Sequence, residues 1–291
     1  MRTPATLRSN AEALAGPLPP LLAAAEHLAA SVMAGEHGRR RVGQGDQFWQ
    51  YRPSHAGDEA RSIDWRRSAM SDALYVREKE WQAAQSVMLW LDSGQSMEFS
   101  SDKKLATKAD EARRIALALT VLLGRAGERV GLSNAGLPPR SGQLQLMRLT
   151  DALGSEAEEA EYQPPELRGI PPRSRAVFIS DFMADLAPVE KALTKATDRG
   201  ISGALLQVLD PQEEAFPFDG RTIFESVGGT MSHETMKAGD LRDRYLDRLA
   251  ERKAALQNLA RATGWQYYCH HTDRPASGAL LWLYQALERV H

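Results

Sequence analysis

The pattern of hydrophobic and polar positions is organised around residues 87–97, which read VMLWLDSGQSM. The five apolar residues at 87–91 are too few to cross a membrane and too uniformly apolar for a strand with one solvated face. They therefore predict a central strand that is covered on both faces of a sheet. Asp92 follows directly. Because ligands of open α/β sheets bind at the carboxyl ends of the strands, residues 92–96 are predicted to form a binding loop.

Strands and helices alternate along the rest of the chain. Apolar runs predict strands at 130–132, 176–179, 204–209 and 265–268, and a hairpin at 216–224 around Asp219 and Gly220. Apolar residues at helical spacing predict helices at 105–123, 143–153, 186–197, 232–263 and 278–290. We expect Ser101 or Asp102 to cap the first of these helices, and Leu144 to face inward from the second. The strand at 176–179 leads into Asp181, so two buried strands end beside a carboxylate.

The first 80 residues differ in character from the rest. Two short helices are predicted before residue 35, and the second, at 21–33, has an apolar stripe suited to docking against a core. Residues 38–80 are dense in Arg, Asp and aromatic residues, and their period-two apolar bursts predict extended segments and turns. The interleaved charges favour Arg–carboxylate pairs that hold this segment in place; the alternative is a partner-binding face of Trp and Arg. We therefore divide the chain into a helical and extended segment at 1–80 and a domain at 81–291.

Composition narrows the possible partners. The 291 residues carry a net charge of −2, which provides no general attraction to nucleic acid or to anionic membranes. No apolar run approaches the roughly 20 residues of a transmembrane helix. The single cysteine, Cys269, excludes an intrachain disulfide and requires no oxidising compartment. These features predict a cytoplasmic protein without a membrane span and without a nucleic-acid partner.

Familiar catalytic motifs are absent from the sequence. It has no Walker-type phosphate loop, no GxGxxG after the first strand and no Gly-x-Ser-x-Gly elbow. Cys269, His270 and His271 are consecutive, and neighbours on a strand point to opposite faces, so these three residues lack the spacing of a zinc site. We expect no ATP hydrolysis by the chain itself.

Several short motifs between residues 45 and 97 carry a family resemblance. They are Gly45-Asp46-Gln47-Phe48, Tyr51-Arg52-Pro53, Gly57-Asp58, Arg61-Ser62-Ile63-Asp64-Trp65, Val76-Arg77-Glu78 and the LD…SM end of the central strand. In these motifs the chain resembles the DUF58 family, whose second half is a von Willebrand factor A-like domain. The resemblance implies an α/β fold with a doubly wound, mostly parallel sheet of Rossmann type, preceded by N-terminal helices and the Arg/Asp/Trp-rich extended segment.

A metal site is part of what the resemblance implies. Many von Willebrand A domains bind a divalent ion through an Asp-x-Ser-x-Ser loop, a Thr and a distant Asp, and in this chain the matching residues are Asp92, Ser96 and Asp181. Oxygen ligands of this kind suit Mg²⁺ or another hard divalent cation. Gly94 replaces the first serine, and the loop after Leu132 has no threonine. The alternative is a vestigial site in which the two aspartates accept backbone hydrogen bonds.

Two functions of different classes follow. The resemblance implies a non-enzymatic adaptor that works with a MoxR-type AAA+ ATPase and its client protein in assembly or maturation. In that case, replacing Asp64 or Trp65 should destabilise the fold, whereas a change at Gln95 should weaken partner binding. The alternative is a divalent-metal-dependent hydrolase in which Asp92 and Asp181 hold a metal-activated water.

Overall fold

The computed structural model of the chain describes residues 20–35, 48–55, 63–70, 73–79, 84–154, 160–225 and 232–288. Its main sheet has six strands in the order β10-β7-β6-β3-β4-β5. The strands are β3 (Ser86–Leu91), β4 (Arg129–Leu132), β5 (Leu137–Arg140), β6 (Arg175–Ser180), β7 (Ser202–Leu209) and β10 (Gln266–His271). All neighbours pair in parallel except β4 and β5, which are antiparallel. Numbered along the chain, this is the 3-2-1-4-5-6 order of a doubly wound sheet, and it confirms the predicted fold class.

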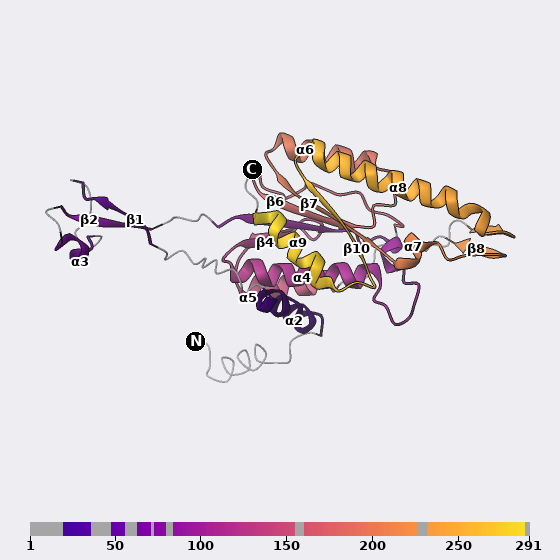
Figure 1. Cartoon of the computed structure of the whole chain (residues 1–291), viewed down its shortest axis with the longest axis horizontal. Helices are drawn as coiled ribbons and strands as arrows, with labels where there is room; N and C mark the ends of the chain where they lie inside the picture. The colour runs from indigo at the N-terminus through magenta and orange to yellow at the C-terminus, as the bar shows by residue number, and fades with distance from the viewer. Residues whose placement is uncertain are drawn as a thin grey trace, which may run out of the picture.

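Helices cover both faces of this sheet (Figure 1). One face packs against α2 (Pro20–Gly35), α4 (Lys108–Arg125), α5 (Gln143–Leu153) and α9 (Ala276–Glu288), and the other against α6 (Ala187–Asp198) and α8 (Gly239–Ala262). Side chains of β3 alternate between the two cores: Leu89 belongs to the first, and Met88 and Trp90 to the second. Because both faces are buried, the strand is apolar without interruption.

The N-terminal elements lie in two places. As predicted, α2 docks against the core, with Leu22, Ala25, Ala29 and Val32 buried, and it packs against α4 and α9. A second, two-stranded sheet pairs β1 (Phe48–Pro53) with β2 (Tyr75–Lys79) beside α3 (Trp65–Ser68), and Figure 1 shows it apart from the main sheet. The helix predicted before α2 lies outside the described residues, and the division of the chain at residue 80 stays a prediction.

Several predicted boundaries were wrong. The cap of α4 is Thr107, whose side chain accepts the Asp110 N–H, and not Ser101 or Asp102. Leu144 is 67% exposed rather than inward-facing. The predicted helix at 232–263 begins only at Gly239, because β9 (Ser232–Thr235) pairs with β8 (Thr222–Glu225). The hairpin was therefore predicted too early, and Asp219 and Gly220 precede its first strand.

Several short elements escaped prediction, among them α3, which lies in the segment predicted to be extended, and two elements of the main domain. The edge strand β5 contains Pro138 and Pro139, which only an edge strand accommodates because proline cannot donate to a sheet ladder. The helix α7 (Pro211–Ala215) follows β7 and starts with a capping box formed by Asp210 and Glu213. This capping box fixes the position of Glu213 at the carboxyl edge of the sheet.

Candidate functional site

The candidate site lies where β3 and β6 end side by side, which is the topological switch point of the sheet. Asp92 follows β3 and Asp181 follows β6; both carboxylates are buried. The two oxygens of Asp92 accept hydrogen bonds from the Gly94 N–H and from the Ser180 hydroxyl, each at 2.8 Å. Asp181 Oδ1 accepts the Met183 N–H at 3.0 Å. The two aspartates therefore hold the strand-to-loop junctions together.

A buried lysine ammonium is the principal charge of the site. Lys108, only 1% exposed, extends from the first turn of α4. Its Nζ donates to Asp181 Oδ2 at 2.8 Å and to Glu213 Oε1 at 2.7 Å. The same nitrogen lies 5.8 Å from the centre of the Phe99 ring. One cation thus links β6, α4 and α7 through two carboxylates.

Burial shapes the protonation of these groups. Burial opposes the charge of Lys108, but Asp181 and Glu213 outweigh it and raise the lysine pKa above its ordinary value. Burial also raises the pKa of Glu213, because Lys108 only partly offsets it. For Asp92, burial exceeds the opposing hydrogen bonds from Gly94 and Ser180 and raises the carboxyl pKa to about 6. With a pKa of about 6 the Asp92 carboxyl is mostly ionised at pH 7, and Lys108 is the one positive charge among these three groups.

The residues of the implied metal site do not fit a divalent ion in this arrangement. Both Asp92 oxygens accept protein donors, and the second oxygen of Asp181 accepts Lys108. A Cβ atom at Gly94 would lie 2.6 Å from the Glu161 carbonyl oxygen, so a serine cannot stand there without a backbone shift. Among the three predicted ligands, Ser96 alone has a side-chain oxygen without a hydrogen-bond partner. Positive charge beside Asp181 comes from Lys108 instead.

A hollow of about 510 Å³ opens beside this cluster. Ser96, Lys108, Asp181 and Glu213 supply polar groups to its lining. Its larger apolar and aromatic residues are Phe99, Tyr162, Met183, Phe216, Phe218, Ile223 and Tyr245. Tyr162 and Ile223 are exposed, whereas burial raises the pKa of the Tyr245 hydroxyl to about 12. Ser100, Ser101, Glu161, Gln212 and Thr222 complete the lining, so the hollow offers aromatic surface together with many polar groups.

Comparisons with known proteins cover most of the chain. A family model described as "Protein of unknown function DUF58" matches residues 50–255. The chain belongs to the DUF58 family. "Uncharacterized protein Mb1516" of Mycobacterium bovis is 23% identical over 262 residues, which cover 84% of this chain and 80% of that relative. "Uncharacterized protein Rv1480" of Mycobacterium tuberculosis has the same identity and coverage.

Two solved structures resemble this DUF58 protein. An aerotolerance-related membrane protein from Bacteroides fragilis has a TM-score of 0.43 and 15% identity, covering 71% of this chain and 100% of that one. The conserved hypothetical protein BatB from Bacteroides thetaiotaomicron has a TM-score of 0.39 and 14% identity, covering 70% and 98% respectively. In the described part of the DUF58 chain, no helix has the length and apolar character needed to cross a membrane.

The residues that carry the DUF58 resemblance are only partly described. Asp46, Gly57, Asp58 and Arg61 lie outside the described residues, and Arg52 and Arg77 are described only as backbone positions of β1 and β2. Asp64 caps α3 by accepting the Arg67 N–H at 3.0 Å. Trp65 is 61% exposed, so the expectation that its replacement destabilises the fold has no structural support.

Sequence reasoning found Asp92, Ser96 and Asp181 but missed Lys108, Glu213 and Tyr162. A signal for Lys108 was present. A lysine in the first turn of a helix opposes the helix dipole, and such a conflict with a local rule often marks a functional or strongly constrained position. Glu213 belongs to the Asp-Pro-x-Glu pattern of a capping box, which indicates a helix start and not a site, whereas Tyr162 has no comparable local signal.

Proposed function

We propose that this DUF58 protein is a non-enzymatic interaction module, an adaptor for a MoxR-type AAA+ ATPase and its client protein. The observation that carries this proposal is the ion-paired cluster of Lys108, Asp181 and Glu213 at the switch point of the sheet. This is the position at which open α/β sheets bind their ligands. One ammonium already pairs with both carboxylates there, so the cluster supports the hollow as a fixed structural element.

The arrangement of Ser180 and Asp92 gives further support. Although the Ser180 hydroxyl donates to Asp92, its oxygen also accepts the Phe182 N–H at 2.9 Å. A serine beside a carboxylate could in principle act as a catalytic nucleophile, but a nucleophile must reach its substrate and Ser180 is only 2% exposed. Ser180 and Asp92 are therefore better suited to holding the ends of β3 and β6 together.

We infer that a partner docks over the hollow. Aromatic residues anchor many protein interfaces, and a pocket that already holds its shape reduces the entropy cost of binding. Tyr162 and Ile223 combine exposure with a place in the lining. Gln95 is only half exposed, and its N–H donates to the Ala160 carbonyl. Tyr162 and Ile223 are therefore the sharper test of this surface.

Binding of the purified chain to a MoxR-type ATPase from the same organism tests the proposal. We expect Tyr162→Ala and Ile223→Ser each to weaken binding at least about tenfold, the size of a moderate interface contribution. Thermal unfolding should stay unchanged. Leu144→Ser is the matched control, since Leu144 is exposed on α5 and does not line the hollow. Normal binding by both hollow variants would refute the proposed surface. Turnover of phosphate esters with Mg²⁺ or Mn²⁺, lost in Asp92→Asn, would instead support the hydrolase.

A further inference from the structure

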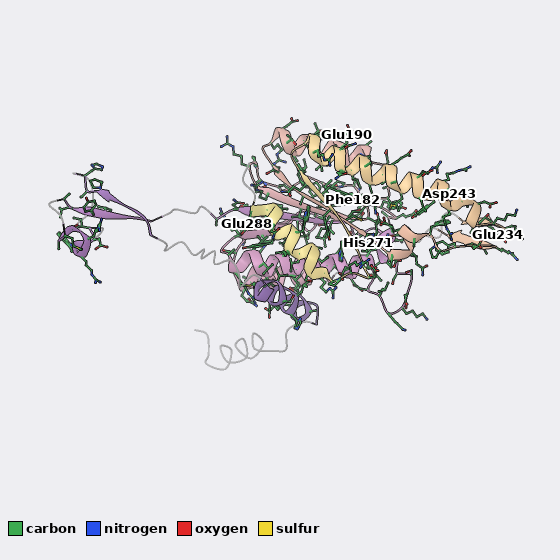
Figure 2. The ribbon with its side chains drawn as sticks, viewed as in Figure 1. Phe182, Glu190, Glu234, Asp243, His271 and Glu288 are labelled. Atoms are coloured by element: carbon green, nitrogen blue, oxygen red, sulfur yellow. The ribbon has the colours of Figure 1, made fainter. Side chains whose placement is uncertain are left out.

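A second cluster of side chains of metal-ligating types lies at the carboxyl end of β10. Cys269 and His271 are two positions apart on this strand and therefore point to the same face. Glu214 of α7 meets them there, and one ligand atom from each of the three residues lies within 4.8 Å of the others. Figure 2 labels His271 at this end of the sheet. His270 takes no part, because it points to the other face and contacts Glu111.

We propose that Glu214, Cys269 and His271 bind a divalent transition-metal ion, with zinc as the preferred ion. A thiolate, an imidazole and a carboxylate form a typical borderline-soft ligand set for zinc. Zinc binds these ligands at about 2.0–2.3 Å, so side chains this close need only small torsional changes to face one ion. Three protein ligands leave a fourth tetrahedral position for water or for a group from a bound partner.

Partial exposure makes the cluster accessible. The side chains of His271 and Glu214 are 26% and 42% exposed, and Cys269 is half-buried. An ion can therefore enter without opening the core. Binding forms a metal–sulfur bond and releases the thiol proton to solvent, so the charge of the site rises by one less than the charge of the ion.

A metal ion at this site must displace the ammonium of Lys253 on α8 from Glu214. The Lys253 Nζ donates to both oxygens of Glu214 at 2.5 Å, and Glu214 also contacts His271 Nε2. Without an ion, this ammonium supplies the positive charge that the carboxylate requires. A metal on Glu214 has to compete with it. Lys253 therefore acts as an internal competitor, and its removal should tighten metal binding.

This site is separate from the Lys108 cluster. Glu213 and Glu214 are consecutive in α7, but Glu213 binds Lys108 whereas Glu214 faces β10. The zinc proposal therefore does not depend on the proposed adaptor function. The consecutive residues Cys269, His270 and His271 lack the spacing of a zinc site, but Cys269 and His271 share a face of β10. The third ligand, Glu214, comes from an element distant in the sequence.

Titration of Zn²⁺ and Co²⁺ into the untagged, chelator-treated chain tests the proposal. We expect one ion per chain by calorimetry, and with Co²⁺ a thiolate-to-metal charge-transfer band in the near ultraviolet. Cys269→Ser should abolish this band, and His271→Gln and Glu214→Gln should each weaken binding at least about tenfold, as is typical when a site loses a ligand or its support. His27→Gln is the matched control, because His27 is exposed on α2.

Lys253→Met is expected to strengthen metal binding, a result that a loss of folding cannot produce. Removing the competing ammonium should strengthen Zn²⁺ binding several-fold, whereas a purely structural cluster would bind no ion in either protein. The proposal is overturned if the wild-type chain and Lys253→Met both show no binding. It is also overturned if the cobalt band persists in Cys269→Ser, or if His27→Gln weakens binding as much as His271→Gln.

Discussion

At the scale of single residues, the site depends on one lysine. Taking an ammonium out of water is costly, and only close carboxylates with good geometry repay that cost. Lys108 meets this requirement through Asp181 and Glu213. These partners are 73 and 105 positions away in the sequence, and no local pattern connects them. The strand-end aspartates could be predicted from apolar runs, whereas the cation between the carboxylates depends on tertiary packing.

Replacing Lys108 tests this dependence. Lys108→Met leaves the buried Asp181 and the partly buried Glu213 without their cation, so we expect the free energy of unfolding at pH 7 to fall by about 3–5 kcal/mol. Urea denaturation measures it, with the exposed Lys103→Met as control. Added Mg²⁺ should restore part of the loss in Lys108→Met and leave the wild type unchanged. A wild-type chain that Mg²⁺ stabilises through Asp92 would speak for the metal site that the resemblance implies.

Asp92 supplies a prediction on pH. Its carboxyl pKa rises from 3.8 to about 6 on folding, so between these values the folded chain retains a proton that the unfolded chain has lost. Stability therefore falls as pH rises through this window, by about 3 kcal/mol for this group. Asp92→Asn removes the titration and keeps an oxygen to accept the Gly94 N–H. The variant should gain this stability relative to wild type between pH 4 and pH 7 in urea denaturation. Parallel profiles for the two proteins would contradict the burial argument.

At the scale of elements, the long strands and helices followed from the sequence, and the short connections did not. Uninterrupted apolar runs identify β3, β6 and β7 because both faces of the sheet are buried. The proline-containing β5, the five-residue α7 and the β8–β9 hairpin carry too few residues for any period to show. Yet α7 supplies Glu213 to one cluster and Glu214 to the other. The chemistry of this edge thus resides in an element that periodicity misses.

One buried contact connects the helix α4 with the strand β10. The Glu111 carboxylate on α4 forms a hydrogen bond with His270 Nε2 on β10 at 3.0 Å, and it forms an ion pair with Arg114. Burial opposes its ionisation, but the hydrogen bonds from His270 and Arg114 prevail and lower its pKa. This stabilising effect is complete above the ordinary carboxyl pKa and disappears as pH falls through the lowered value. Glu111→Gln should cost about 1.5–3 kcal/mol at pH 7 in urea denaturation. The surface control Asp110→Asn should cost less than about 1 kcal/mol; equal losses would contradict the buried contact.

At the scale of the whole molecule, an adaptor needs two surfaces, one for each protein that it connects. The hollow at the edge of the main sheet is one candidate. The other is on the small β1–β2 unit, which lies apart from the main sheet in Figure 1. Its exposed apolar side chains are Trp65, Met70 and Leu74, at 61%, 79% and 47%. The exposed arginines 66 and 67 lie between Trp65 and Met70 in the sequence, and Trp and Arg are enriched among residues that dominate binding energy.

Substitutions on the two surfaces should weaken the binding of different partners. Trp65→Ala should leave the free energy of unfolding within about 0.5 kcal/mol of wild type, because the side chain is exposed. It should nevertheless weaken binding of the client protein by about 30-fold, the effect of losing a hot-spot residue. Tyr162→Ala should weaken binding of the ATPase, as proposed for the hollow, and leave binding of the client unchanged. Asp64→Ala is the structural control: it removes the α3 cap and should cost about 1 kcal/mol. If Trp65→Ala and Tyr162→Ala weaken the same partner equally, both residues serve a single interface, and the protein does not connect its partners through two separate surfaces.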